Sequence, residues 1–272
     1  MRIHKPICIL AAVALGAVAA LAQSRLVGVT GDGASVSETL YWLSKTDASS
    51  TFLMSLGNGN DGETIGYNPA DGLLYHASGI STGDRYWESI DVNTASIVTS
   101  GQFTGPNVTN EQLAITYNPN TGRLLVTDRT NQLFDTTTSG TATDIGDVAE
   151  DLKGLAFVGS TLYGAAAFDG LLYTLDPSDG SSLGTLAITM NSAGISGMNG
   201  LATNPDDGTL WAIVRQGSSR HLATINTTTG VATSVGTLGD NFAGIAFVPV
   251  PEPATMAALG LGAAALLRRR KK

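Results

Sequence analysis

The chain has 272 residues, including 33 glycines and one cysteine; 43% of the residues are hydrophobic and the formal net charge is −8 at pH 7. This composition excludes a collagen-like repeat, a disulfide-rich scaffold and a polybasic nucleic-acid-binding protein. The apolar fraction suffices for a buried core, which also excludes disorder of the whole chain.

The N-terminus predicts a secretory signal peptide over residues 1–22. Arg2 and Lys5 precede an uninterrupted apolar stretch, Ile7–Leu21, and small residues lead to a cleavage site after Ala22. The stretch is short for a bilayer span, so cleavage and export are favoured over a permanent anchor. The single cysteine lies in this segment and is expected to leave with it.

The segment that remains is strongly acidic. Residues 23–250 contain eight basic and 22 acidic side chains, which gives a formal charge of −14. Such a surface keeps a protein soluble and repels nucleic acid. We therefore expect no nucleic-acid partner.

Residues 23–249 contain a repeat. Each copy has an apolar triplet, Asn-Pro, a glycine turn and an apolar run; full copies begin at Ile65, Ile115 and Leu201, and shortened ones at Gly154 and Gly244. Measured between equivalent apolar positions, the copies are 50, 40, 46 and 44 residues apart. A period of roughly 45 residues is typical of a β-propeller blade.

Each unit holds four short strand-like runs separated by turn residues. In one unit these runs are Gly154–Val158, Thr161–Ala166, Leu171–Asp176 and Ser182–Ala187. Proline, glycine, aspartate and asparagine divide them, and a helical period is absent from the core. Four strands per unit predict an all-β fold made of propeller blades.

The two ends of the core predict closure of a ring. The core opens with three runs, Leu26–Thr30, Thr39–Ser44 and Thr51–Leu56, and closes with one, Gly244–Val248. Pairing the last run with the first three completes a fifth blade and removes exposed sheet edges. The predicted fold is a five-bladed β-propeller with three-plus-one strand closure. The alternative is a pair of β-sandwiches, which explains neither the Asn-Pro repeat nor these ends.

Two phrases resemble the repeats of exported NHL-like and lactonase-like propellers: Gly154–Phe157 and Leu172–Pro177. The resemblance implies a propeller core. A lactonase-type activity would require ligands from several blades to converge on a metal, and the candidates at the starts of the units are Glu63, Glu111, Asp151, Asn199 and Asp240. The sequence alone does not show that they meet.

Other metal and catalytic signals are weak. Asn60, Asp61 and Glu63 form an oxygen-rich loop that suits calcium but lacks EF-hand spacing, and plain turn chemistry explains it equally well. We expect no cofactor, with calcium as the alternative. His76 and His221 lack zinc-ligand neighbours, and no serine lies in a nucleophile elbow. No catalytic residue is assigned.

Aromatic residues offer one candidate ligand site. Trp42, Trp87 and Trp211 each lie in a predicted strand, where packing between blades is the expected role. Tyr86 and Trp87, beside Asp84 and Arg85, form the pair that could instead stack on a sugar.

The C-terminal segment, residues 250–272, predicts a sorting signal. The prolines at 251 and 253 interrupt structure, residues 254–267 form a short uncharged stretch suited to a helix, and basic residues follow as a stop-transfer tail. The motif residues are Pro251, Glu252 and Pro253, and the tail consists of Arg268, Arg269, Arg270, Lys271 and Lys272. The order resembles the PEP-CTERM sorting signal of exported bacterial proteins. The alternative is an ordinary tail anchor, for which the apolar stretch is short.

The resemblance implies processing by an exosortase, transient contact with the inner membrane, and final placement in the cell envelope or outside the cell. The predicted function is a non-enzymatic propeller that binds a polysaccharide or an envelope protein in the extracellular matrix. The alternative is a metal-dependent, lactonase-like hydrolase on the same scaffold. Metal at the propeller axis would favour the hydrolase.

Overall fold

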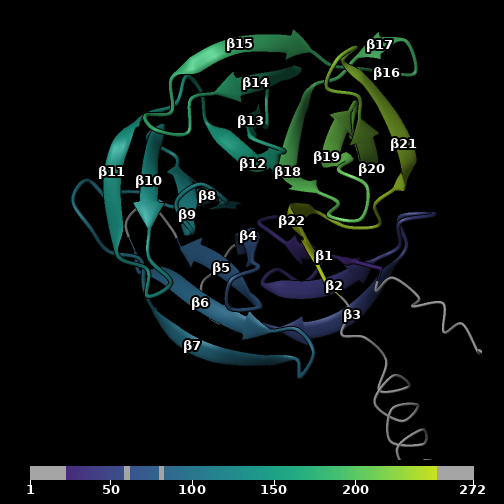
Figure 1. The fold of residues 1–272 in the computed structure, drawn as a ribbon. Coiled ribbons are helices and arrows are strands. Elements are labelled where there is room, and N and C mark those ends of the chain that lie inside the picture. Colours follow the sequence, from purple (N-terminus) through teal and green to yellow (C-terminus); the bar gives the residue numbers. More distant parts are fainter. Residues whose placement is uncertain (1–22, 58–61, 80–82, 250–272) are drawn as a thin grey trace, which may run out of the picture. The chain divides into compact units, whose positions relative to one another are not determined.

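The computed structural model describes residues 23–57, 62–79 and 83–249. Residues 24–249 form five β-sheets arranged in a ring around a central axis, each with four antiparallel strands (Figure 1). We number these sheets blades 1 to 5 and describe the strands of each from the axis outward. The predicted all-β, five-bladed propeller is confirmed, and the pair of β-sandwiches is excluded.

The strands have the following bounds. Blade 1 contains β22 (Phe242–Val248), β1 (Arg25–Thr30), β2 (Thr39–Leu43) and β3 (Ser50–Ser55). Blade 2 contains β4 (Gly62–Asn68), β5 (Leu73–Gly79), β6 (Arg85–Asp91) and β7 (Ser96–Gln102). Blade 3 contains β8 (Gln112–Asn118), β9 (Arg123–Asp128), β10 (Gln132–Thr136) and β11 (Ala142–Asp147). Blade 4 contains β12 (Leu152–Val158), β13 (Thr161–Ala166), β14 (Leu171–Leu175) and β15 (Ser182–Ala187). Blade 5 contains β18 (Gly197–Thr203), β19 (Leu210–Gln216), β20 (Ser219–Ile225) and β21 (Val231–Thr237). Two short strands, β16 (Thr189–Met190) and β17 (Ala193–Gly194), extend blade 5 beyond β21.

The ring closes as the sequence predicts. Strand β22, from the end of the described chain, pairs antiparallel with β1, from its beginning, with Arg25 opposite Val248 and Val29 opposite Gly244. Blade 1 therefore combines one C-terminal strand with three N-terminal strands. This pairing ties the two ends of the propeller together and removes two sheet edges.

The repeated Asn-Pro pairs are turn devices. Asn68, Asn118 and Asn204 are buried at the ends of their inner strands. The side-chain oxygen of each accepts a hydrogen bond from the backbone nitrogen two residues ahead, over 3.0, 3.0 and 3.1 Å. These Asx turns reverse the chain from the first strand of a blade into the second. The repeat that predicted the blades is thus a structural signal.

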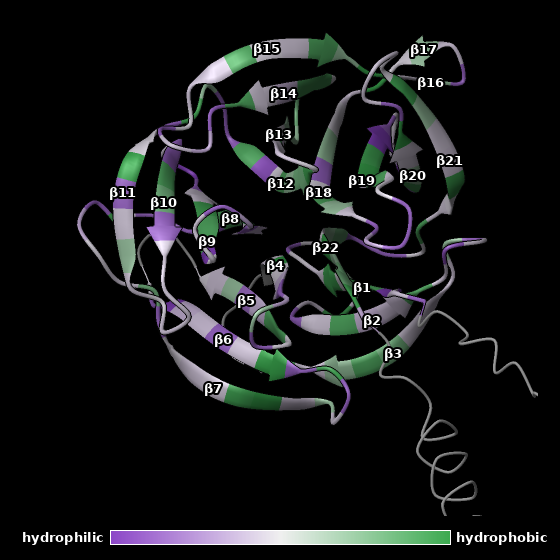
Figure 2. Cartoon of the chain, in the orientation of Figure 1, coloured by the Kyte–Doolittle hydropathy of each residue, from purple (hydrophilic) through white to green (hydrophobic). Residues whose placement is uncertain are grey.

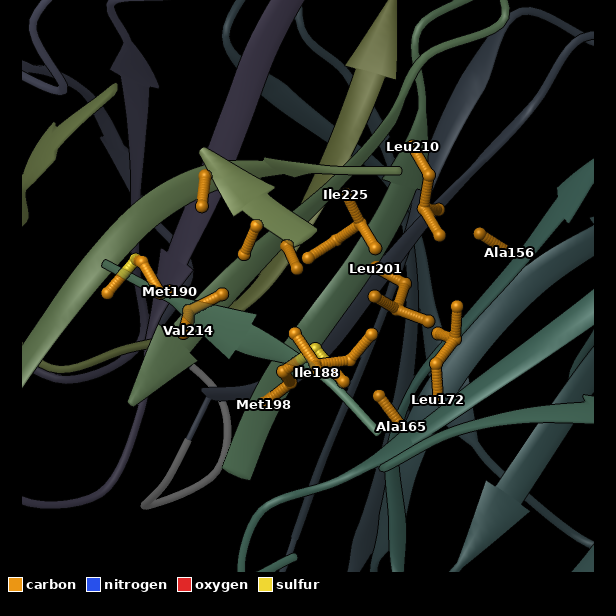
Figure 3. Close-up of a cluster of buried hydrophobic side chains, with 13 residues drawn as sticks. Ala156, Ala165, Leu172, Ile188, Met190, Met198, Leu201, Leu210, Val214 and Ile225 are labelled. Carbon is orange, nitrogen blue, oxygen red and sulfur yellow. The ribbon is translucent and has the colours of Figure 1, made fainter. Parts of the chain in front are cut away.

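Hydrophobic side chains fill the junctions between blades. Five clusters of buried residues are present, each built from two neighbouring blades. Figure 3 shows the cluster between blades 4 and 5, where Leu172 and Ala165 face Met198, Leu201 and Val214. Hydrophobic segments recur in every blade in Figure 2, while the turns are mostly hydrophilic. Stability therefore comes from packing blade against blade.

Small residues let the inner strands approach one another. A Cβ atom at Gly154 would lie 2.8 Å from the backbone nitrogen of Leu201 in blade 5. One at Gly244 would lie 3.0 Å from the backbone nitrogen of Ile65 in blade 2. Glycine at these positions permits five blades to close tightly around the axis.

The signal peptide with its cleavage site at Ala22, and the predicted helix and basic tail of residues 250–272, lie outside the described residues. Among residues 23–57, 62–79 and 83–249, no helix is long and apolar enough to cross a membrane.

Candidate functional site

The inner strands β4, β8, β12, β18 and β22 all begin at one end of the axis, which we call the amino face, and end at the other, the carboxyl face. At the amino face lies a cavity of about 350 Å³, which we call the cationic cavity. Blades 1, 3, 4 and 5 line it with Asp32, Arg129, Lys153, Ala167, Phe168, Asn199, Arg215, Arg220, Asn241 and Ala243. Four of the eight basic residues in the acidic segment 23–250 thus surround one cavity, beside one carboxylate among the described lining residues.

A β-bulge places Lys153 at this cavity. In the pairing of β12 with β13 the register shifts between Leu152 and Gly154, so that Lys153 has no residue opposite it. The first strands of the other four blades also carry a register shift close to their start. A bulge redirects the side chain of the extra residue, and in blade 4 that residue is a lysine.

Two arginines come from the hairpin of β19 and β20. Arg215 and Arg220 are directly opposite each other in the register, an arrangement that like charges disfavour. Arg215 donates a 3.3 Å hydrogen bond to the carbonyl oxygen of Ala167, and Arg220 a 2.5 Å bond to that of Phe242. Backbone carbonyl groups thus help to orient both guanidinium groups.

The remaining basic group is partly neutralised. Arg129 lies 2.5 Å from the carboxylate of Glu111, whose side chain is almost fully buried, while half of the Arg129 side chain is exposed. Burial raises the pKa of Asp151, and the neighbouring charges of Lys153 and Arg129 oppose that rise. A carboxylate therefore holds Arg129 on the blade 3 side of the cavity, and backbone carbonyl groups help to orient Arg215 and Arg220 on the blade 5 side.

Two further groups complete the cavity. Asn199 is 5% exposed, and its side-chain oxygen has no hydrogen-bond partner among the described residues. Phe168 is 77% exposed, and the Arg215 guanidinium lies 4.9 Å from the centre of its ring. An exposed ring next to cations and a buried amide can stack on a ring-shaped ligand that carries negative charge.

The predicted ligand pair is only partly accessible. Trp87 is 2% exposed and packs between Tyr75 and Phe103, with ring centroids 5.5 and 5.3 Å away. Its indole nitrogen donates to the carbonyl oxygen of Thr138 over 3.1 Å. The ring of Trp87 is therefore out of reach of a saccharide, and only Tyr86 remains partly exposed. Alternation along β6 places one residue of the pair inside and the other outside.

The candidate metal residues do not assemble into a visible centre. Asn60, Asp61 and the side chain of Glu63 lie outside the described residues. Of the other residues at the starts of the units, Glu111 pairs with Arg129, and Asp240 accepts a 3.0 Å hydrogen bond from the backbone of Ser35. In the described part of the chain, no group of three His, Cys, Asp or Glu side chains is placed to hold a metal ion.

The two histidines have different environments. His76 is fully buried between two carboxylates, 3.2 Å from Glu88 and 3.5 Å from Glu38. His221 is half-buried on β20 and lies 3.3 Å from the hydroxyl of Ser234. Neither lines the cationic cavity, in keeping with the structural roles expected for them.

The four basic residues of the cavity are not among the site residues predicted from the sequence. Arg129 follows the second strand of blade 3, Arg215 lies near the end of the second strand of blade 5, and Arg220 lies near the start of its third. In an antiparallel blade these positions share the amino face with the start of the first strand. The place of each basic residue within its repeat would therefore have assigned all four to the amino face.

Comparisons with known proteins support the two parts of the chain separately. Residues 249–271 match the PEP-CTERM protein-sorting motif. This motif implies export across the inner membrane and processing by exosortase, as the sequence predicts. A search of curated proteins gives no match.

Solved structures resemble the propeller. A protein of unknown function from Bacteroides caccae is 10% identical with a TM-score of 0.55, and the match covers 83% of this chain and 99% of that one. A nidogen/laminin complex is 10% identical with a TM-score of 0.53, covering 83% and 98%. A putative 6-phosphogluconolactonase from Bacteroides uniformis is 14% identical with a TM-score of 0.44, covering 84% and 83%. At 10% identity the first two matches concern the fold alone.

Proposed function

We propose that this protein is an exported, non-enzymatic binding protein that holds an acidic polysaccharide at the cationic cavity. The carrying observation is that four basic side chains gather at one end of the axis in an otherwise acidic propeller. Charge-assisted hydrogen bonds from arginine to a carboxylate are among the stronger polar contacts in proteins. The overall negative charge repels polyanions elsewhere on the surface, which restricts such a ligand to this cavity.

The other cavity groups suit a sugar that carries a carboxylate. The exposed ring of Phe168 offers a flat apolar surface beside Arg215. The side-chain oxygen of Asn199 can accept a hydrogen bond from a ligand hydroxyl group, since it accepts none from the described residues. A polymer of uronic acid sugars has all three features: a ring, hydroxyl groups and a carboxylate.

The sorting motif supports a role outside the cytoplasm. A protein exported with such a signal meets the polymers of the cell envelope and extracellular matrix. We propose that the propeller remains there and acts as a binding module for the acidic polymers of that matrix, with no metal or cofactor.

The test is a comparison of two polysaccharides of equal length, a polygalacturonate and a neutral glucan. We expect the polygalacturonate to bind more tightly, and its affinity to fall as salt is raised. Replacing Arg215 or Arg220 with Gln should lower the affinity about tenfold or more, the size of a lost charge-assisted hydrogen bond. The matched control is Arg123→Gln, because Arg123 pairs with Asp135 away from this cavity.

Three outcomes would count against the proposal. The neutral glucan could bind as tightly as the polygalacturonate. Arg123→Gln could weaken binding as much as the cavity variants do. Prolonged incubation could produce new chain ends in either polymer, which would show that the protein is an enzyme.

A further inference from the structure

A second cavity, of about 500 Å³, opens at the carboxyl face, and we call it the apolar cavity. Each blade lines it with the same four positions around the end of its inner strand. The deepest position carries Ile65, Ile115, Leu155, Leu201 and Ile245, and the next carries Gly66, Thr116, Ala156, Ala202 and Ala246. Then come Tyr67, Tyr117, Phe157, Thr203 and Phe247, and at the rim Pro69, Pro119, Gly159, Pro205 and Pro249. The apolar part of the sequence repeat therefore forms the wall of this cavity.

Aromatic residues occupy one level of the wall in four of the five blades. Tyr67, Tyr117 and Phe157 are each partly exposed, although they lie in an apolar setting. Each packs on one side against the cluster at a blade junction, and the rest of its surface remains accessible at the cavity. Apolar surface left in water at the mouth of a cavity favours an apolar ligand.

The wall offers no charged partner to a ligand. The hydroxyl group of Thr203 donates a 2.7 Å hydrogen bond to the carbonyl oxygen of Phe157, within the wall itself. Among the described residues, no charged side chain lines the cavity. A charged ligand would lose its hydration here without gaining an ion pair with the wall.

Charged groups near the mouth belong to local networks. Burial and then the nearby charge of Asp71 raise the pKa of Tyr67, so a carboxylate lies close to the rim in blade 2. At the rim of blade 5, Asp206 follows Pro205 directly and pairs with Lys45 over 3.4 Å. These charges lie at the rim, and the wall below them is apolar.

The walls are held by close backbone contacts. A Cβ atom at Gly66 would lie 2.6 Å from the side chain of Ile115, and one at Gly154 would lie 2.8 Å from the backbone of Leu201. Because neighbouring inner strands are already in contact at these glycines, they cannot move further inward to fill the apolar cavity. A cavity that is formed before the ligand arrives loses little free energy in ordering its walls.

We propose that the apolar cavity is a binding site for a small uncharged apolar molecule containing an aromatic ring. This site is separate from the cationic cavity, and the proposal does not depend on the acidic polysaccharide. A volume of about 500 Å³ falls within the range of small-molecule sites, which is roughly 300 to 1,000 Å³.

The experiment uses the full chain and two uncharged probes. Fluorescence titration with N-phenyl-1-naphthylamine should show saturable binding of one molecule per chain. Phe157→Arg in blade 4 and Thr203→Arg in blade 5 each place a charge in the wall of the cavity. Each substitution should lower the affinity for the probe at least about tenfold. The matched control is Phe52→Arg, on the outer strand β3, where the phenylalanine is 60% exposed; it should leave binding within about twofold, as expected for a distant surface site.

Photolabelling of the unaltered chain with benzophenone provides a readout that does not depend on the folding of any variant. Mass spectrometry should locate the label on peptides containing Tyr67, Tyr117 or Phe157. Any of three results would overturn the proposal. The label could be confined to other peptides, binding could fail to saturate, or a folded Phe157→Arg or Thr203→Arg protein could keep full affinity.

Discussion

Removing strand β22 should prevent the propeller from folding. All seven residues of this strand are buried, and four of them are large: Phe242, Ile245 and Val248 are 1% exposed and Phe247 is 5% exposed. Burying one such side chain contributes about 1.5–3 kcal/mol, so the four together contribute about 8 kcal/mol. Because the free energy of unfolding of a domain is about 5–15 kcal/mol in total, a chain ending at Asn241 should lack a stable fold.

The assay is urea denaturation followed by tryptophan fluorescence. The ring of Trp211 lies 5.7 Å from that of Phe247, so its emission reports directly on whether β22 is docked. The control is a circular permutant in which residues 239–249 precede Ser24 and the chain ends at Leu238. It keeps the β22–β1 pairing as a local hairpin, because Val248 lies opposite Arg25. We expect the permutant to unfold cooperatively and the truncated chain to show no transition. A truncated chain with the same midpoint and slope as residues 23–249 would refute three-plus-one closure as the source of stability.

Three smaller predictions concern single side chains. Gly154→Ala should lower the free energy of unfolding, measured by urea denaturation, by about 1–3 kcal/mol, because its Cβ would lie 2.8 Å from a backbone nitrogen of β18. The control Gly184→Ala, whose Cβ would have nothing within 4 Å, should change it by less than about 0.5 kcal/mol. Hydrogen bonds from two neighbouring serines lower the pKa of Asp47 to about 2 from 3.8, so the stability it adds is complete above the unfolded value and is lost as the pH falls toward 2. Asp47→Asn should therefore flatten the dependence of the melting temperature on pH in that window, and an unchanged slope would contradict this. His76→Leu removes the imidazole between two buried glutamates and should cost about 3 kcal/mol or more, while His221→Leu should have a much smaller effect, with both measured by thermal unfolding.

The fold could be predicted because its signals are local. Asn68, Asn118 and Asn204 each fix a turn by a hydrogen bond to a residue two positions ahead, so the spacing of such turns is visible in the sequence. Closure could also be predicted, since three strands at one end and one at the other leave a single way to complete a blade. Neither inference required knowing in advance which residues distant in the sequence are in contact.

The site could not be predicted in the same way, since it depends on contacts between blades. Arg129 and Arg220 are far apart in the sequence and meet only because the ring brings blade 3 and blade 5 to one axis. Trp87 shows the converse. Its neighbours Asp84 and Arg85 suggested an exposed surface, but Trp87 packs in a cluster with Phe134 of blade 3, and its indole nitrogen donates to the carbonyl oxygen of Thr138 in that blade. The sequence near Trp87 does not show that blade 3 packs over it.

The two ends of the axis differ in how far their lining residues follow the sequence repeat. At the carboxyl face the wall of the apolar cavity keeps the same character in every blade, because an aliphatic residue there also packs the blade junctions. At the amino face the bulged residues of the inner strands are Glu63, Leu113, Lys153, Gly200 and Ala243, and only Lys153 and Ala243 of these line the cationic cavity. Leu113 is fully buried, so its position serves the core. The four basic residues of the cavity therefore come from single blades and are not part of the repeat. The repeat explains the wall at the carboxyl face but not this charge at the amino face, which supports the proposal that the cationic cavity binds a charged ligand.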